Sequence, residues 1–564
     1  MKFPDINFFK VTTTKNREKD MDSQKIKKCF LVNLLLVGMV IFAFFLAWLF
    51  YYFPYLISLG KSSFFAYHPS FFLGFLTKVG GFCELLSQFT LQFYVGPISI
   101  SLLTFLALVL FCILCFYAAG YYGFLGIALC FLCANGSVPP LINEESLSGM
   151  AFIWGIALNL LAIGLWKGKE RPLSSVFLKG ATVLVLFYLS GFLTTLFVVW
   201  EVVAGLRHFV VLKKILFLEH WILPWIGVIL CVLVIFGFRN PLERTCKRVE
   251  NLVDQENYCE ALRLCDAYYQ KVEETPKWAE NNSIIGRKAE KQGALRFTLA
   301  AYTKWCLLQT GKLNDKFLGY YRIPEMGAMF PAPLPFVNIY SPIYAGIYYD
   351  LGLFAPAVPI LATALEKNKF QNDLLKKFIR LRMVSGHYRL AEDYLYYLSL
   401  NPLYGRFVDS MRSINSEERS KNVTWIVERR ALADTGLCEG GGFIDGWVEK
   451  AYPKYTKNKN LLNYYTLLAL LQKRIEEVPA LTKRYKELGY YRLPTYLQEA
   501  ILLYLGPSQN RNLSGFLLDE SVVKRFNLML RDLELMQRRT ISPEVFTEHY
   551  AHTYFYHFLF GQFI

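Results

Sequence analysis

The chain has 564 residues, enough for two or three domains, and 54% of them are hydrophobic, with a mean hydropathy of +0.28. This apolar content exceeds that of a typical soluble protein, so it argues against a wholly soluble chain and predicts a membrane portion. The formal net charge of +16 suits a surface beside anionic lipid headgroups. We therefore expect the lipid bilayer, and no nucleic acid, among its partners.

The first 28 residues are polar and basic, and no long apolar run interrupts them. A stretch this long and mixed differs from the short leading region of a cleaved signal peptide. We expect residues 1–28 to form a cytoplasmic basic segment. The first apolar stretch after them is expected to remain in the protein as an anchor.

Six apolar stretches follow within residues 29–238, and each approaches the roughly 20 residues that a helix needs to cross a bilayer. They are residues 29–50, 97–117, 119–137, 148–166, 175–199 and 221–238. Because a backbone in lipid has no water to satisfy its polar groups, each stretch must be helical. The sequence thus predicts a transmembrane domain of about six helices, in which Asn33 and Asn159 can form hydrogen bonds between helices.

Basic residues near these stretches indicate an orientation, since Lys and Arg close to membrane helices tend to remain cytoplasmic. Three basic clusters share one side if the chain crosses six times: one before residue 29, one in "KGKER" at 167–171 and one after residue 238. This predicts a cytoplasmic N-terminus and a cytoplasmic C-terminal half. One crossing more or fewer would instead put residues 239–564 outside the cell.

The same topology makes residues 54–96 a long external loop, rich in Phe, whose only charged residues are Lys61, Lys78 and Glu84. Such an apolar segment is unsuited to bulk water, so we expect it in the headgroup zone or over the ends of the membrane helices. It is either a structural lid or a surface that holds a lipid tail or a partner's helix.

Two cysteine pairs, Cys112 with Cys115 and Cys130 with Cys133, match the spacing of a zinc ribbon. They lie in apolar stretches, where thiolates are unfavourable and a thiol packs as a small hydrophobic group. The histidines of "EHYAHTYFYH" spread over too broad a helix face for a tight metal site. We therefore predict no metal, no cofactor and no catalytic residue, and we favour a non-enzymatic chain over an enzyme.

From about residue 245 the apolar spacing is near 3.6, which predicts an all-helical domain over residues 239–564. Two segments in it repeat one pattern at an interval of 34 residues: Gly at a turn, an aromatic residue two positions on and Ala three beyond that. These residues are Gly352, Phe354 and Ala357, and then Gly386, Tyr388 and Ala391. The Gly permits a tight turn, the aromatic residue fills the gap to the next helix, and the Ala allows close approach.

This pattern resembles the tetratricopeptide repeat, whose period is about 34 residues. Fainter copies are Tyr258 with Ala261, Phe297 with Ala300, and Gly489 with Tyr491 and Pro494. The predicted fold class is therefore all-α, a six-helix transmembrane bundle followed by an α-solenoid. The proline-rich stretch at 320–344 cannot be continuous helix and is either a packed loop or a recognition loop. The aromatic C-terminal end is expected to be buried, as a capping helix or against the membrane.

Four features together resemble an uncharacterised bacterial family of multi-pass inner-membrane proteins with a C-terminal tetratricopeptide-like domain. They are the segment "GGFCELLSQFTLQFY", the six apolar stretches, the helical repeats and the ending "TYFYHFLF". The resemblance implies a place in the bacterial inner (plasma) membrane, and it contributes no catalytic residue.

Two functional hypotheses follow. Stacked helix pairs form curved surfaces that most often bind proteins or peptides. The leading hypothesis is an integral membrane protein that anchors a helical-repeat interaction domain at the membrane, as a scaffold or assembly factor. The alternative is a membrane enzyme or transporter that handles a lipid-linked substrate through the Phe-rich loop at 54–96.

Overall fold

The structure is a computed structural model. It describes residues 65–93, 154–155, 157–159, 161–162, 165, 174–190, 198, 241–273, 287–320, 323, 337–367, 372–431, 444–454, 457–506, 512–513 and 516–561. The chain divides into two compact units. Unit 1 comprises Met1–Leu56, Lys78–Ser87 and Phe93–Arg239, and unit 2 comprises Ile57–Thr77, Gln88–Gln92 and Asn240–Ile564.

In unit 1 the longest described helix is α8 (Ser174–Ser190). Its Ser190 hydroxyl accepts a hydrogen bond from the buried Asn159 side chain at 3.1 Å, and Asn159 also donates to the Gly155 carbonyl at 2.7 Å. The predicted bond of Asn159 between helices is thus confirmed, whereas Asn33, named with it, lies outside the described residues. Several large apolar side chains of α8 are exposed, among them Leu184 and Phe187.

The predicted six-helix transmembrane bundle has to be corrected. Among the described residues, no helix combines the length and the apolar character needed to cross a membrane. Helix α8 lies in the predicted stretch 175–199, most of whose remaining residues lie outside the described ranges. The predicted stretches at 29–50, 97–117, 119–137 and 221–238 lie outside the described residues, and the stretch at 148–166 lies only partly within them.

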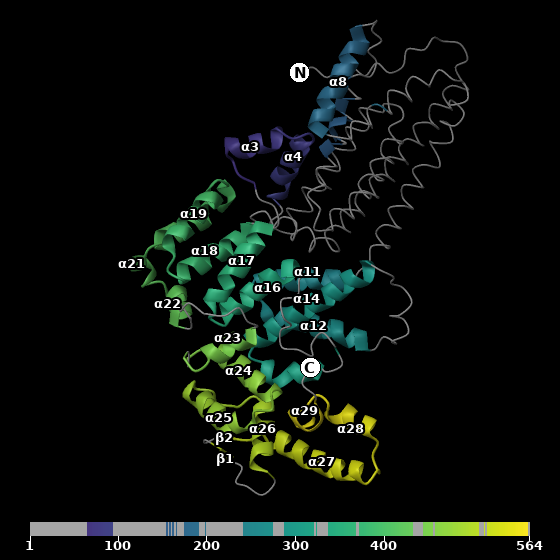
Figure 1. Cartoon of the computed structure of the whole chain (residues 1–564), viewed down its shortest axis with the longest axis vertical. Helices are drawn as coiled ribbons and strands as arrows, with labels where there is room; N and C mark the ends of the chain where they lie inside the picture. The colour runs from purple at the N-terminus through teal and green to yellow at the C-terminus, as the bar shows by residue number, and fades with distance from the viewer. Residues whose placement is uncertain are drawn as a thin grey trace, which may run out of the picture. The chain divides into compact units, whose positions relative to one another are not determined.

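Unit 2 is built mainly from short helices. After α3 (Pro69–Leu76) and the end of α4 (Gly81–Leu91), its first part contains, in chain order, α11 (Pro241–Asp254), α12 (Tyr258–Glu273), α14 (Arg287–Gln309), α15 (Leu313–Lys316), the 3-10 helix η4 (Phe317–Tyr320), α16 (Val337–Asp350), α17 (Phe354–Lys367), α18 (Asn372–Val384), α19 (Tyr388–Ser399), η6 (Pro402–Tyr404), α20 (Gly405–Ile414), α21 (Glu417–Ser420) and α22 (Thr424–Ala431). Helix α16 packs on α17, α17 on α18, and α18 on α19. Residues 350–398 therefore contain the turns of two consecutive helical hairpins, and we call α11 to α19 the hairpin array (Figure 1).

The second part of unit 2 follows as α23 (Ile444–Ala451), α24 (Lys459–Leu471), η7 (Ile475–Glu477), α25 (Val478–Glu487), α26 (Thr495–Leu505), β1 (Asn512–Leu513), β2 (Phe516–Leu517), α27 (Glu520–Gln537), α28 (Pro543–Tyr550) and α29 (Tyr554–Phe560). Strands β1 and β2 pair antiparallel, with Leu513 opposite Phe516. The all-α prediction missed this hairpin because two-residue strands are too short to show an alternating pattern. We call α24 to α29 the C-terminal part.

Seven of the described helices of unit 2 end in one backbone arrangement. The residues with positive φ at these ends are Glu256, Gly311, Gly352, Gly386, Lys473, Gly489 and Arg539. At each, the N–H of that residue donates to the carbonyl three residues back, and the next N–H donates to the carbonyl five residues before it. These paired bonds are the Schellman motif, which satisfies carbonyls that the helix itself leaves free.

The C-terminal part returns to the middle of the array, so unit 2 is not a simple linear stack (Figure 1). Asn314 of α15 donates to the Asn463 carbonyl of α24 at 2.8 Å, and the Leu318 N–H of η4 donates to the Tyr496 hydroxyl of α26 at 2.9 Å. One continuous hydrophobic core includes residues from Leu242 to Tyr554. Helices α14 and α15 thus act as a hub to which both parts attach.

Candidate functional site

The predicted repeat-signature residues lie at the two hairpin turns of the array. Gly352 and Gly386 have φ of 76° and 80°, the left-handed conformation that favours glycine. Ala357 and Ala391 are fully buried, and Phe354 is 2% exposed. Tyr388 is half-buried, and its hydroxyl lies 2.6 Å from the Ser420 hydroxyl of α21. These side chains hold helices together and leave little surface for a ligand, and their assignment to tetratricopeptide repeats stays a prediction.

The fainter copies of the pattern differ in outcome. Tyr258 and Ala261 follow Glu256 at the spacing of the signature, and Glu256 adopts the left-handed φ that glycine takes elsewhere. Phe297 lies inside the continuous 23-residue helix α14 and therefore marks no turn. Tyr491 follows Gly489, yet its side chain is 95% exposed and fills no gap.

Asp350, just before the Gly352 turn, is a buried carboxylate. Its Oδ2 accepts from Trp305 Nε1 of α14 at 2.7 Å, and its Oδ1 lies 3.1 Å from Arg429 Nη1 of α22. Burial raises the pKa of this carboxyl, although the Arg429 charge and the Trp305 bond oppose the shift. Asn458, at the start of α24, donates to the neighbouring Leu351 carbonyl at 2.8 Å. Four segments far apart in the sequence therefore meet at one turn.

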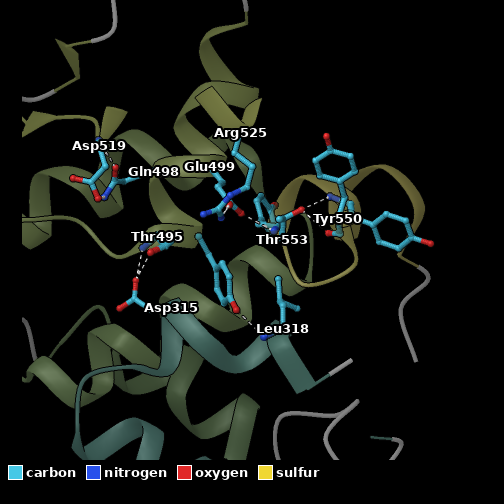
Figure 2. Close-up of polar contacts among 12 residues, drawn as sticks. Asp315, Leu318, Thr495, Gln498, Glu499, Asp519, Arg525, Tyr550 and Thr553 are labelled. Atoms are coloured by element: carbon cyan, nitrogen blue, oxygen red, sulfur yellow. Dashed lines mark hydrogen bonds and ion pairs between the residues drawn. The ribbon is translucent and has the colours of Figure 1, made fainter. Parts of the chain in front are cut away.

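Glu499 of α26 is the most enclosed acid of the C-terminal part, with a fully buried side chain. Figure 2 shows its two contacts: Arg525 Nη1 of α27 donates to Oε1 at 3.0 Å, and the Tyr554 N–H of α29 donates to Oε2 at 2.7 Å. Burial raises the pKa of this carboxyl to about 7, against the lowering effects of the Tyr554 bond and of Arg525. One carboxylate thus joins three helices and can change its charge near neutral pH.

Other polar contacts surround Glu499 (Figure 2). Asp315 of α15 accepts from both the N–H and the hydroxyl of Thr495, each at 2.6 Å, and so caps the N-terminus of α26. Gln498 donates to Asp519 at 3.0 Å and accepts from the Asp519 N–H at 2.7 Å. These contacts fix where α26 begins and where α27 begins. They join secondary-structure elements, so we interpret them as structural.

The residues weighed for metal binding give no such site where the structure describes them. No group of three or more His, Cys, Asp or Glu residues within the described ranges is arranged to hold a metal ion. Burial lowers the pKa of both His552 and His557, and His557 Nε2 lies 3.3 Å from the Leu471 carbonyl. Cys112, Cys115, Cys130 and Cys133 lie outside the described residues.

The described part of the predicted external loop contacts the array. The Tyr67 N–H donates to the Leu400 carbonyl at the end of α19 at 2.7 Å, and Asn401 donates to Gln92 at 3.3 Å. Gln92 in turn donates to the Tyr67 hydroxyl at 3.2 Å. These bonds form only if both segments lie on one side of any bilayer. The predicted topology puts residues 54–96 outside and residues 239–564 in the cytoplasm. That topology and these contacts therefore exclude each other.

Helix α19 presents apolar side chains to solvent as well as to the core. Ala391, Leu395 and Leu398 are buried, whereas Tyr396 and Tyr397 are 53% and 51% exposed. Leu390 on the same helix and Leu403 in η6 are also exposed. We call Leu390, Tyr396, Tyr397 and Leu403 the α19 surface, and aromatic side chains of this kind are enriched at protein interfaces.

Sequence reasoning missed Asp350 and Glu499. Each is a single acid within an apolar run, "IYYDLGLF" and "YLQEAILLYL". A carboxylate in such a run has to be buried with the helix face, and a buried charge needs a partner. That signal was available, but it names neither Arg429 nor Arg525 as the partner.

Comparison with known proteins places the chain in a family without naming an activity. No curated protein and no solved structure matches it. A family model described as "Family of unknown function (DUF6057)" matches residues 207–561, which is well over half of the chain and includes every described helix from α11 to α29. The chain therefore belongs to the DUF6057 family.

Proposed function

We propose that this protein is a non-enzymatic scaffold that binds a protein or peptide partner on the α19 surface of its helical array. The observation that supports it is the exposure of two adjacent tyrosines and two leucines on α19 and η6, next to a face that packs in the core. Adjacent exposed aromatic side chains on a rigid helix contribute large contact area at a low cost in conformational entropy.

The proposal includes association with a lipid surface, the membrane of the bacterial cell. Its support is the apolar composition of the chain and the exposed apolar side chains of α8, including Leu184, Val185 and Phe187. The alternative of an enzyme or transporter for a lipid-linked substrate gains no support from residues 65–93. Their one acidic residue is Glu84, which leaves no carboxylate pair for acid–base work.

Site-specific photo-crosslinking in living cells tests the binding surface. A photo-reactive amino acid replaces Tyr397 in the full chain, and a matched variant carries it at Lys524, an exposed position of α27. We expect a discrete adduct with another protein from position 397 and none from position 524. Adding Leu390→Ser and Leu403→Ser should remove that adduct while leaving the thermal unfolding midpoint unchanged.

Adducts from both positions, or adducts that persist in the Leu390→Ser, Leu403→Ser variant, would contradict a specific surface on α19. Recovery of the chain in the soluble fraction after ultracentrifugation of a cell lysate would contradict the membrane part alone. The two parts of the proposal can therefore fail separately.

A further inference from the structure

Residues 65–77 are unusual in composition. This segment, "FAYHPSFFLGFLT", has five aromatic residues and no Asp, Glu, Lys or Arg. Its helix α3 buries none of its residues. An apolar helix that its own protein does not enclose indicates an interaction surface.

One side of the segment is fixed to the array. Phe65 is 2% exposed and contacts the rings of Phe71 and Phe72 in α3, with centroid distances of 5.5 and 5.8 Å. The bonds of Tyr67 and Gln92 to the end of α19 attach the same segment through polar groups. Helix α3 is therefore held in place near the end of α19 (Figure 1).

The other side of α3 faces solvent. Leu73 is 59% exposed, and it lies about 160° around the helix from Phe75, at 100° per residue. Helix α3 has eight residues, so its length of about 12 Å is far too short to cross a bilayer. A helix of this length and composition suits the boundary between headgroups and acyl chains, where aromatic side chains concentrate.

The sequence on both sides of the segment identifies what covers this face. No charged residue occurs from residue 29 to residue 60, and none occurs from residue 85 to residue 143. Between these uncharged stretches the charged residues are Lys61, Lys78 and Glu84. The two lysines flank the segment on either side, which suits anionic lipid headgroups.

We propose that α3 docks on a lipid bilayer, with Leu73 inserted at the boundary of the headgroups, and thereby seats the α19 end of the array on the membrane surface. This inference rests on the membrane association in the proposed function. It adds which face of the protein meets the lipid, and it places residues 65–77 and the array on the same side of the bilayer.

Photo-crosslinking to lipid tests the proposal on the full chain. The chain is reconstituted in vesicles of phosphatidylethanolamine and phosphatidylglycerol with a photo-reactive amino acid at Leu73. A matched variant carries it at Tyr491, which is more exposed and lies between α25 and α26. We expect phospholipid adducts, identified by mass, from position 73 and none from position 491. Equal lipid adducts from both positions, or only protein adducts from position 73, would overturn the docking of α3.

A second pair of variants distinguishes a loss of lipid contact from a failure to fold. The photo-reactive residue is placed at Gly74, also in α3, and is combined with Leu73→Asp or with Leu73→Ile. We expect lipid adducts to be lost with Asp and retained with Ile, while circular dichroism stays the same. Lipid adducts that survive Leu73→Asp would count against the proposal. A chain that stays with the membrane but gives no lipid adduct would refute this inference and leave the proposed function standing.

The shared side is tested with a membrane-impermeant thiol reagent. His68→Cys, just before α3, and Ser413→Cys in α20 are compared in intact cells, each in a chain whose exposed Cys259 is replaced by Ser. Equal labelling of the two positions is expected. Labelling of only one of them would show that a bilayer separates the segments and would overturn the seating of the array on α3.

Discussion

The hairpin array and the C-terminal part of unit 2 use the same helix ends but different interiors. Both contain Schellman turns, at Gly352 and Gly386 in the array and at Lys473 and Gly489 in the C-terminal part. In the array, small and aromatic residues close the gaps between helices that are neighbours in the chain, and the buried Asp350 at the Gly352 turn is a polar exception. In the C-terminal part, buried polar groups join helices that are distant in sequence.

This difference between local packing and distant polar contacts shows which contacts a sequence pattern can reveal. Ala357 and Ala391 recur at a fixed interval because each hairpin repeats the same local packing. Glu499 bonds to Tyr554, 55 residues away, and Asn314 bonds to Asn463, 149 residues away. Such contacts occur once each, so no periodicity records them.

The largest effect is expected at the aromatic position of the repeat pattern, which is buried at Phe354 and exposed at Tyr491. Phe354→Ala should lower the stability of the array by about 3–5 kcal/mol, because it removes a large buried side chain and leaves a cavity. Tyr491→Ala should change stability by about 0.5 kcal/mol or less, because Tyr491 is almost fully exposed. Hydrogen–deuterium exchange of α16 and α17 measures the local loss in the full chain. Similar changes in both variants would contradict the contrast between a packed and an exposed copy.

The buried acid of the C-terminal part should respond to both mutation and pH. Arg525→Met should destabilise this part by about 3 kcal/mol at about pH 8, because it leaves a buried carboxylate without its cation. Near pH 5.5 the loss should be smaller, because Glu499 then takes up a proton. Lys524→Met is the control, since its ion pair with Glu520 is exposed and worth about 0–1 kcal/mol.

The sign of the pH effect follows from the direction of the shift. The pKa of Glu499 in the folded protein, about 7, lies above its ordinary value, so folding favours the protonated form. Its contribution to stability is fully present below the unfolded pKa and is lost as the pH rises through about 7. His552 acts in the opposite direction, because burial and Arg525 lower its pKa. Glu499→Gln should therefore remove the Glu499 contribution only, and a pH profile unchanged by that substitution would contradict this assignment.

A close approach in the array gives the next effect. A Cβ at Gly346 of α16 would lie 2.6 Å from Cζ2 of Trp305, whose indole is held by its bond to Asp350. Gly346→Ala should therefore destabilise the array by about 1–3 kcal/mol through overpacking. Gly293→Ala in α14 is the matched control, because its Cβ would meet no atom within 4 Å. It should stabilise the helix by about 0.5–1 kcal/mol, and thermal unfolding of the two variants should therefore move in opposite directions.

The sequence predicted the helices and the turns of the array because glycine and 3.6-residue spacing are local signals. It placed Gly352 and Gly386 at turns, where the structure has positive φ. It treated residues 320–344 as a loop, yet α16 begins at Val337 and includes Pro342. Proline in a helix removes one hydrogen bond, and the packing of α16 on α17 outweighs that local preference.

The sequence could not predict the attachment of the C-terminal part to the hub. Asp315 and Thr495 are 180 residues apart, and neither stands out among exposed polar residues before the fold brings them together. The contact of Tyr67 with Leu400 was hidden for a further reason, since the predicted topology put the two residues on opposite sides of a bilayer. Orientation rules count charges near apolar stretches and contain no information about tertiary contacts.

The smallest effect is expected at the Schellman turns, the helix ends that both parts of unit 2 share. Gly386→Ala should cost about 1 kcal/mol, because φ is 80° there and open space around the Cβ position leaves backbone strain as the only penalty. Glu256→Gly, at φ of 59° in the equivalent turn after α11, should gain up to about 1 kcal/mol by relieving the same strain. Thermal unfolding midpoints of the full chain measure both changes. If the two substitutions shift stability in the same direction, the turns are not equivalent, and the sequence signature that includes glycine would describe a different structure from the turn at Glu256.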